Sequence, residues 1–446
     1  MTETFTTPQG LTLAYERRGS GPLLVCHPGG PGGSAAEFRD FAGLDDTFEL
    51  VLLSPRGSVG SDPADDYSLA SYVADVDALR EHLGVEQLDL LGFSHGGCIS
   101  MAYAAAHPAH VRRLLLVDTL AVWGEEAEAA MQRGVEARSG EPWFADAAKA
   151  IEEEQGGEFS SAEELIANLQ RQIPLYFHRW EGNEQTGREL AADFAEAKPL
   201  QHFNTAEFPT LDLRDELRAI RASTLVVAGG DDFICGPACA DAIVGELANA
   251  QLVTIPDSGH FVYVEQPEAF RAALTDFLLT EDAVAALRSG RAVILPTDTV
   301  YGLCALREHE DVLYELKGRD RAKPIALLAA DVDGLVAAVP GLDPVVLNRY
   351  LPGPYTLIVG RVGVRVPNLP SVAAAVVRGV GVVAATSANL SGGPDPRRVD
   401  DIPEEIRAAC GAVVDVGELP GVPSTVIDLT GGEPRVLRQG AGPVPE

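Results

Sequence analysis

Residues 88–97 read LDLLGFSHGG, and this short stretch decides how the first part of the chain folds. An apolar run leads into GFSHG at residues 92–96, which fits the pattern G-x-S-x-G of a strand that turns sharply into a helix. The turn brings the strand and the helix so close together that a side chain at Gly92 or Gly96 would clash. The small-residue run CISMAYAAAHP that follows predicts the helix. The pattern makes Ser94 a candidate nucleophile.

The neighbouring sequence repeats the same rhythm. Residues 11–120 alternate short apolar runs with Gly-rich turns and helical stretches, as in PLLVCHPGGPGG, FELVLLSPRG and VRRLLLVDT. This alternation predicts a mainly parallel sheet covered by helices. Since reactive groups gather at the carboxyl ends of such strands, the partners of Ser94 are expected after later strands.

A serine hydroxyl is a poor nucleophile until a base takes its proton, so a histidine and an orienting acid must follow. Asp231 and Asp232 come after the strand STLVVAGG, and His260 comes after QLVTIPDSG. The order Ser, Asp, His along the chain is the one expected of this kind of sheet. We take His260 as the base and prefer Asp232 as the acid because it lies further past the strand end. Asp231 stays open as the alternative.

The negative oxygen of a tetrahedral intermediate needs preorganised hydrogen-bond donors. The first is the backbone N–H of His95, directly after the nucleophile, and the second comes from the loop HPGGPGG at residues 27–33. Its glycines let the backbone approach the substrate, so Gly29 or Gly30 is the expected donor. The imidazoles of His27 and His95 are interpreted as structural.

These residues resemble the α/β-hydrolase family, and the GGPGG loop is most similar to its proline iminopeptidase-like branch. The resemblance covers about residues 8–279 and implies a hydrolase domain at 1–279, with a helical cap at about 122–214 and no cofactor. In that branch acidic cap residues hold the free amino group of the substrate, but this cap is acidic throughout and no single residue stands out. An ester, a lactone, an amide or an N-terminal peptide therefore all remain candidate substrates.

The rest of the chain carries a second set of motifs: PTDTVYGL, KGR followed by KP, PGPYTL, TSANLSG, PSTVIDLTG and VLRQGA. They set basic residues, which suit phosphates, and small polar residues, which suit sugar and base edges, beside β-branched strands. In this order, over residues 282–441, they resemble the threonylcarbamoyl-AMP synthase family. The resemblance implies an open twisted α/β sheet at 280–446. One helix is expected to close at Leu279 and another to begin at Glu281.

The same resemblance implies a reaction of L-threonine, bicarbonate and ATP, with Mg²⁺ shielding the phosphates. The product, L-threonylcarbamoyl-adenylate, would serve a downstream transferase that modifies an adenosine in tRNA. Thr299 and Ser424 match threonine contacts. Nucleotide contacts are implied for Lys317, Arg319, Lys323, Thr356, Ser387, Asn389 and Arg438. Asp395 stands where the family usually has a nucleotide-contacting serine.

Composition limits the other classes of function. Most of the net charge of −32 falls before residue 281, which disfavours nucleic-acid binding by the first domain. No stretch approaches the roughly 18 apolar residues of a membrane span, and Met1–Gly10 lacks the parts of a signal peptide, so we expect a cytoplasmic protein. The six cysteines lack metal-ligand spacing, which predicts buried thiols and no metal site.

Three functions fit the sequence. The leading hypothesis is a bifunctional enzyme that joins a serine hydrolase, of aminopeptidase or esterase type, to a threonylcarbamoyl-AMP synthase. A second is a hydrolase whose C-terminal domain only binds a nucleotide or a small acid. The third moves the adenylate chemistry to the carbamoylation of a small molecule.

Overall fold

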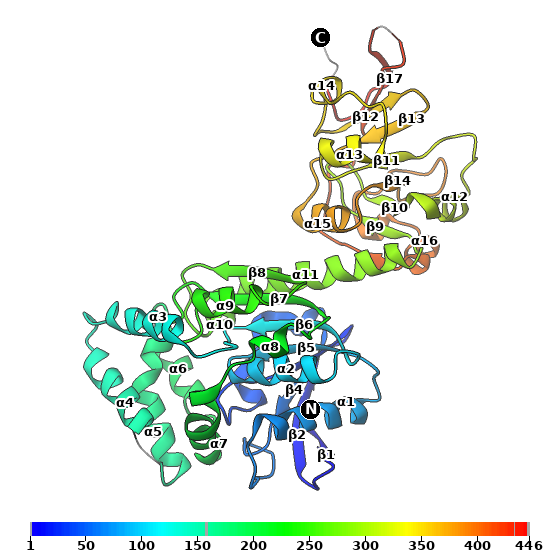
Figure 1. Ribbon diagram of the computed structural model, residues 1–446. Coiled ribbons are helices and arrows are strands. Elements are labelled where there is room, and N and C mark those ends of the chain that lie inside the picture. The colour runs from blue at the N-terminus through cyan, green and yellow to red at the C-terminus, as the bar shows by residue number, and fades with distance from the viewer. Residues whose placement is uncertain (1, 157–158, 432, 444–446) are drawn as a thin grey trace. The chain divides into compact units, whose positions relative to one another are not determined.

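Two β-sheets, each in its own unit, organise the chain (Figure 1). The computed structural model describes residues 2–156, 159–431 and 433–443. The first unit ends at Leu274 and the second begins at Thr275, five residues before the boundary predicted from the motifs. In the part of the chain that is described, no helix is long and apolar enough to cross a membrane.

The division between the units falls inside a single helix, α11 (Pro267–Arg288). The prediction that two helices meet at Thr280 is wrong, because one helix runs through this residue. The residues between Pro267 and Gly290 include neither glycine nor proline, so nothing in the sequence stops the helix before Gly290, which has φ 82°. The motif resemblance separated two domains correctly in sequence order but contained no information on the helix between them.

The first unit is built on an eight-stranded sheet in the order β1-β2-β4-β3-β5-β6-β7-β8. The β1–β2 and β2–β4 pairs are antiparallel, and every pair from β4 to β8 is parallel. All residues of β5 are buried, as expected for a parallel strand covered on both faces. The strands are β1 (Thr2–Thr6), β2 (Thr12–Arg18), β3 (Leu23–His27), β4 (Glu49–Ser54), β5 (Leu88–Phe93), β6 (Val111–Val117), β7 (Ser223–Gly229) and β8 (Ala250–Ile255).

Helices surround this sheet and follow its strands. The helices and short 3₁₀ turns outside the insertion are η1 (Ala35–Phe38), η2 (Phe41–Asp46), α1 (Leu69–Leu83), α2 (His95–Ala106), α8 (Arg214–Leu217), α9 (Pro237–Val244) and α10 (Val262–Glu265). Helix α2 packs on β3, β5 and β6, and small residues along it allow this close approach.

A helical insertion follows β6. Val122 and Asp212 pair as an isolated antiparallel bridge, so the segment leaves the sheet and returns to it at one place. Its helices gather on one side of the first unit (Figure 1). They are α3 (Glu125–Glu136), α4 (Phe144–Gly156), α5 (Ala162–Gln172), η3 (Ile173–Tyr176), α6 (Glu184–Leu190), α7 (Lys198–His202), η4 (Phe203–Glu207) and η5 (Phe208–Thr210). This insertion spans the range for which the sequence predicts a cap.

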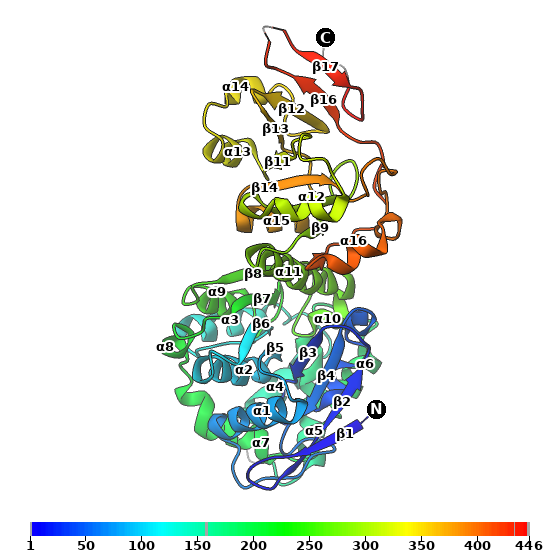
Figure 2. The same ribbon diagram turned by 90° about the vertical axis from the view of Figure 1, so that its right-hand side faces the viewer.

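The second unit contains a nine-stranded mixed sheet in the order β15-β9-β10-β14-β11-β13-β12-β16-β17. Its last two strands form a hairpin near the C-terminus (Figure 2). The strands are β9 (Val293–Leu295), β10 (Gly302–Leu306), β11 (Ala326–Leu328), β12 (Tyr355–Val359), β13 (Val362–Arg365), β14 (Val383–Ser387), β15 (Ala412–Val413), β16 (Thr425–Asp428) and β17 (Arg435–Arg438). The helices and 3₁₀ turns are η6 (Arg307–His309), α12 (Asp311–Lys317), α13 (Val332–Ala338), α14 (Pro344–Leu347), α15 (Ser371–Val380), η7 (Val399–Asp401) and α16 (Glu404–Ala409).

The core of the second unit has two parts, because alternate residues of each strand point to opposite faces of the sheet. Ile294 belongs to one hydrophobic cluster, whereas Val293 and Leu295 belong to the other. The second cluster includes Ala283 and Leu287, so the end of α11 is part of this unit's core. The six cysteines of the chain are buried free thiols, as predicted.

Candidate active sites

Ser94 lies between β5 and α2, at the turn that G-x-S-x-G predicts. Its backbone has φ 51° and ψ −120°, a conformation that residues other than glycine adopt only under constraint. A Cβ added at Gly92 would come 2.4 Å from the carbonyl oxygen of Gly96, and one at Gly96 would come equally close to that of His27. Both positions therefore require glycine, and the turn that they permit presents Ser94 to a cavity.

His260, which lines the same cavity, forms a buried pair with Asp232. His260 Nδ1 lies 2.8 Å from Asp232 Oδ2, and the two side chains are 5% and 0% exposed. The other oxygen of Asp232 accepts the N–H groups of Ile234 at 3.0 Å and Cys235 at 3.2 Å. Because both oxygens are held, the carboxylate can fix the orientation of the imidazole. His260 lines the cavity together with Ser94.

Asp231, the alternative acid, points elsewhere. Its side chain is 49% exposed, and its Oδ2 lies 2.9 Å from Nδ1 of His178. Its backbone carbonyl accepts a hydrogen bond from Arg138 at 2.8 Å. The structure therefore brings Asp232, and not Asp231, to His260.

A third carboxyl group, Asp118, lies at the end of β6 and was missed in the sequence. Its Oδ1 accepts the N–H of Gly229 at 2.6 Å. Burial, and after it the charge of Asp232, raises the pKa of Asp118 well above its usual range. A protonated Asp118 would add no second negative charge beside the Asp232–His260 pair. Asp118 comes directly after the strand VRRLLLV, and this position is the sequence signal that could have identified it.

The loop at residues 27–33 contains the two glycines, Gly29 and Gly30, that the sequence left open as oxyanion donors. The N–H of Gly29 donates to Glu37 Oε2 at 2.6 Å, and burial raises the pKa of Glu37 to about 8. Gly30 has φ 102° and lines the cavity. Of the two glycines left open by the sequence, Gly30 therefore remains the candidate donor, with the N–H of His95 at the start of α2 as the second candidate.

The imidazoles of His27 and His95 are buried beside Tyr72, and each ring meets the tyrosine edge-on. Burial lowers the pKa of His27 to about 4 and that of His95 to about 3. Both rings are neutral at physiological pH, which agrees with a structural role.

The cavity in front of Ser94 has a volume of about 240 Å³. Its walls are largely aromatic and aliphatic and come mostly from the helical insertion. Glu154 is the one carboxylate among the lining residues that the structure describes. Its two oxygens accept hydrogen bonds from Gln172 Nε2 at 2.6 Å and Asn204 Nδ2 at 3.1 Å. The carboxyl group of Glu154 is thus held at a fixed place in a largely apolar cavity.

The second unit has a cavity of about 570 Å³ against its sheet. Six of the nine residues predicted to bind substrates line it: Thr299, Arg319, Thr356, Ser387, Ser424 and Arg438. Thr356 Oγ1 lies 2.7 Å from Ser424 Oγ, and Arg438 donates to the backbone oxygen of Ser424 at 2.9 Å. These six residues come from the six separate motifs of the second unit, so all six motifs meet at one place.

Lys317 and Asn389, predicted to face the nucleotide, are absent from the lining residues that are described. The ammonium of Lys317 donates to the backbone oxygens of Ser387 and Asn389 and, at 2.6 Å, to Asn389 Oδ1. Burial lowers the pKa of Lys317 to about 8. An ammonium has three protons, so these acceptors leave none for a phosphate. The pair instead holds the loop that follows β14.

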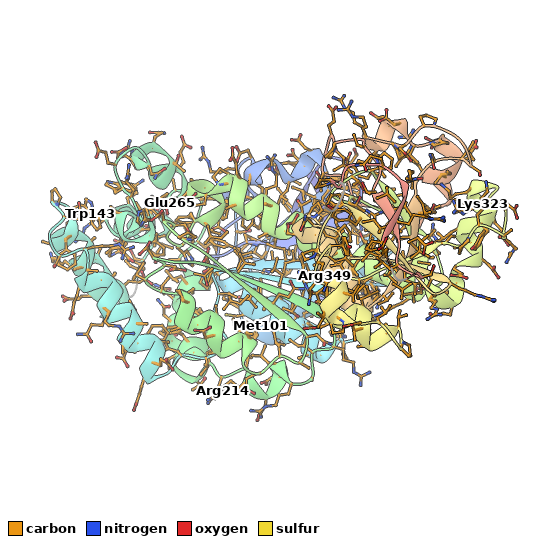
Figure 3. All side chains as sticks on the ribbon, turned by 90° about the horizontal axis from the view of Figure 1, so that it is seen from above. Met101, Trp143, Arg214, Glu265, Lys323 and Arg349 are labelled. Atoms are coloured by element: carbon orange, nitrogen blue, oxygen red, sulfur yellow. The ribbon has the colours of Figure 1, made fainter. Side chains whose placement is uncertain are left out.

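Lys323 is exposed (Figure 3) and is also absent from the described lining of this cavity. It is the third basic residue of the KGR…KP motif that was predicted to bind the nucleotide. Its backbone oxygen accepts a hydrogen bond from Arg319 Nε at 3.1 Å. Lys323 therefore contributes its backbone to the position of Arg319, which does line the cavity.

Three charged residues of the cavity wall had no predicted binding role: Arg361, Arg365 and Asp395. Arg365 lies between the buried Val364 and Val366. Because side chains alternate along a strand, Arg365 points to the face opposite that of the two buried valines. This alternation in VGVRVP is the sequence signal that could have identified Arg365. Arg361 follows β12 and carries no comparable pattern. With Arg319 and Arg438, the cavity has four arginines and one aspartate among its described lining residues.

Comparisons with known proteins divide the chain in the same way. A family model described as alpha/beta hydrolase fold matches residues 22–267, and one described as telomere recombination matches residues 285–440. The chain is 28% identical over 279 residues to the proline iminopeptidase of Levilactobacillus brevis, covering 59% of this chain and 90% of that protein. It is 37% identical over 183 residues to a Mycobacterium leprae protein whose name places it among the threonylcarbamoyl-AMP synthases, covering 36% of this chain and 82% of that protein.

Solved structures resemble the first unit. An alpha/beta fold family hydrolase from Bacillus anthracis str. Sterne matches with a TM-score of 0.50 and 21% identity, over 62% of this chain and 98% of that one. At this identity the likeness concerns the fold alone.

Proposed function

The chain belongs to the alpha/beta hydrolase fold family through its first unit and to the threonylcarbamoyl-AMP synthase family through its second, and from this premise we propose a bifunctional enzyme. One activity is serine-dependent hydrolysis of an aminoacyl ester, amide or N-terminal peptide. The other is the formation of L-threonylcarbamoyl-adenylate from L-threonine, bicarbonate and ATP.

The observation that supports hydrolysis is the shared cavity of Ser94 and the buried His260–Asp232 pair. In the proposed mechanism Ser94 Oγ attacks the substrate carbonyl while His260 takes its proton. The N–H groups of Gly30 and His95 stabilise the oxyanion, and His260 returns the proton to the leaving group. Water, activated by the same imidazole, then releases the acyl group from Ser94.

Glu154 supports an amine-bearing substrate. An apolar cavity favours the body of an acyl group, and a fixed carboxylate within it favours a positive charge. The α-ammonium of an aminoacyl group supplies that charge next to the scissile carbonyl. This agrees with the proline iminopeptidase named among the relatives of the first unit.

Replacing Glu154 with glutamine should reduce kcat/KM for aminoacyl anilides by about 10- to 100-fold, the value of one charged hydrogen bond. Hydrolysis of an uncharged acyl ester of the same size should change by less than about threefold, since it makes no such bond. Steady-state kinetics on the two substrates measure the ratio. The exposed neighbour Glu152→Gln serves as the control, and an equal loss on both substrates would contradict the assignment.

The observation that supports the second activity is the cavity where Thr299 and Ser424 meet Arg319 and Arg438. In the proposed reaction the neutral amine of threonine adds to bicarbonate with loss of water, and the carbamate oxygen attacks the α-phosphorus of ATP as pyrophosphate leaves. The arginines stabilise phosphate charge. Asp395 is a hard oxygen ligand and would hold Mg²⁺, which supplies charge neutralisation. The adenylate then passes to a separate tRNA-modifying transferase.

A second candidate is a C-terminal unit that binds a nucleotide or a small acid without catalysis. The saturated ammonium of Lys317 favours it, because one expected phosphate contact is lost. A catalytic unit differs from a binding unit in a measurable way, since only catalysis makes and reverses the bond to the α-phosphorus.

The full chain should exchange labelled pyrophosphate into ATP only when threonine and bicarbonate are both present. Arg319→Gln should lower this exchange about 30-fold or more, since a charge-assisted contact to phosphate is lost. Arg349→Gln, an exposed arginine outside the described cavity lining (Figure 3), is the control. ATP binding by calorimetry without any exchange would establish the binding function instead.

A further inference from the structure

Two acidic side chains from outside the HPGGPGG motif hold the oxyanion loop at its two ends. Glu37 Oε2 accepts the N–H of Gly29 at 2.6 Å. Ser34, the residue directly after the loop, is bound by Asp193 of the helical insertion. The candidate donor Gly30 lies between these two attachment points, so its place depends on both.

Asp193 binds both the backbone and the side chain of Ser34. Its Oδ2 accepts the backbone N–H of Ser34 at 2.9 Å, and both of its oxygens lie 2.8 Å from Ser34 Oγ. Ser34 is 2% exposed, and its Oγ also accepts the N–H of Ala36 at 3.1 Å, at the start of η1. Asp193 belongs to the insertion, so these bonds form only when the insertion is seated on the loop.

The insertion and the loop also pack directly against each other. A Cβ added at Gly32 would come 3.4 Å from Phe194 and 3.5 Å from Pro199. Phe194 follows Asp193 in the chain and lines the cavity of the first unit, as Gly30 does on the loop. Asp193 itself is absent from the described lining residues. It is therefore placed to hold the loop and not to touch the substrate.

Glu37 joins the same loop to the helix that follows the catalytic histidine. Its backbone oxygen accepts a hydrogen bond from the hydroxyl of Tyr263, on α10, at 3.2 Å. Burial raises the pKa of Glu37 to about 8, against the hydrogen bond from Gly29, and the charge of Asp193 adds to the rise. At neutral pH Glu37 is therefore an uncharged acceptor, and it adds no negative charge next to the oxyanion loop.

We infer that Asp193 and Glu37 are positioning residues of the hydrolase, which place the backbone N–H of Gly30 for the oxyanion only while the insertion is seated on the loop. This inference rests on the hydrolase function proposed above for the same cavity. An insertion that lifts away releases Ser34, and with it one end of the loop. Because donors stabilise an oxyanion only when they are fixed in place, seating of the insertion completes the catalytic site.

The test compares Asp193→Ala and Asp193→Asn with wild type on one uncharged acyl ester. Asp193→Ala should lower kcat by about 10- to 1000-fold, the effect of a misplaced oxyanion donor, while KM stays within about threefold. Asp193→Asn can still accept the Ser34 N–H and donate to Ser34 Oγ, so it should retain at least about a third of kcat. Glu189→Gln is the control, because this acid of the same insertion pairs with Arg39 at the surface and should change kcat by less than about twofold.

Binding of 1-butaneboronic acid separates positioning from a structural role. The boron adds to Ser94 Oγ and places a negative oxygen in the oxyanion hole, so the inhibition constant should rise in Asp193→Ala by about the factor by which kcat falls. A raised KM with an unchanged inhibition constant would overturn the inference, because it means that Asp193 only holds the insertion. Thermal unfolding checks the fold, and if Asp193→Ala unfolds, the pH profile of Glu37→Gln decides.

That pH profile tests Glu37 independently. Above about pH 8 its carboxyl group ionises beside Asp193. Of the other groups around it, Tyr263 stays neutral because burial raises its pKa well above the usual range, and Arg39 is paired with Glu189 at 2.6 Å. The new negative charge opposes the oxyanion, so wild-type kcat should fall at least about threefold between about pH 7 and pH 9.5. Glu37→Gln keeps a neutral acceptor and should remove this fall, and a fall that persists in Glu37→Gln would overturn its role.

Failure of the proposed function gives a different result from failure of this inference. If wild type hydrolyses neither the ester nor an aminoacyl anilide, the rate at which a fluorophosphonate labels Ser94 still reports on the oxyanion loop. Asp193→Ala should then slow labelling about 10-fold or more, and Glu189→Gln should not. If Ser94 is not labelled either, the hydrolase function fails and the inference fails with it. If wild type hydrolyses the ester and Asp193→Ala has the same kcat, only the inference fails.

Discussion

Ser94→Ala should abolish hydrolysis by the first unit, lowering kcat by about 10⁴- to 10⁶-fold, because no other group can form the acyl-enzyme. The loss should be the same for esters and amides, since both pass through attack by Ser94 Oγ. Substrate binding should survive, because the cavity wall otherwise keeps its shape. Burst kinetics with a chromogenic ester, together with mass spectrometry of the trapped acyl-enzyme, measure the two steps separately.

Ser100 provides a matched control for this substitution. It lies on the same helix α2, is fully buried, and its hydroxyl has no hydrogen-bond partner among the described residues. Ser100→Ala should therefore leave hydrolysis within about twofold, since no hydrogen bond is lost. Pyrophosphate exchange by the second unit should be unchanged in both variants. An acyl-enzyme that still forms in Ser94→Ala would refute the assigned nucleophile.

The turn at Ser94 was predictable from sequence because its causes are local. The strained backbone of the serine and the 2.4 Å approaches at Gly92 and Gly96 involve residues close in the chain, with His27 on the adjacent strand. The five-residue pattern therefore carries the constraint at Gly92, and the adjacent strand, through His27, supplies the one at Gly96. The order of the later acid and base follows from the sheet, which fixes where each strand ends.

The two glycines of the oxyanion loop show where this local reasoning stops. Nothing in HPGGPGG distinguishes Gly29 from Gly30 as a donor. The difference arises from Glu37, whose carboxyl oxygen accepts the Gly29 N–H after the chain has turned back on itself. A hydrogen bond to a side chain outside the motif is not encoded in the motif, so both glycines had to stay open.

The second cavity shows the same limit for charged side chains. Motif resemblance identified the segments that meet there, and six of the predicted residues do line the cavity. It could not show that the ammonium of Lys317 is used by the loop after β14, or that the Nε of Arg365 is left without a hydrogen-bond partner among the described residues. Both facts depend on which acceptors lie within about 3 Å, which only the folded chain determines.

The orienting acid is tested by a single-atom change, Asp232→Asn, which should lower kcat by about 10⁴-fold. The amide oxygen can still accept the N–H groups of Ile234 and Cys235, so the local fold is kept. The amide nitrogen would then donate to His260 Nδ1 and force the ring proton onto Nε2, where the base must be free. The imidazole could no longer take the proton of Ser94. Hydrolysis rates of Asp232→Asn measured at increasing pH show how much activity returns when hydroxide replaces the imidazole as the base.

Asp231 provides a matched control, because it is also an aspartate, lies one residue away, and points its side chain to His178 instead of His260. Asp231→Asn changes a half-exposed carboxylate next to His178, and such surface pairs contribute little, so kcat should stay within about twofold. Circular dichroism and thermal unfolding should match for the two variants. A large loss in Asp231→Asn with near-normal Asp232→Asn would reverse the assignment. Equal losses in both would mean that the buried pair with His260 does not orient the base during turnover.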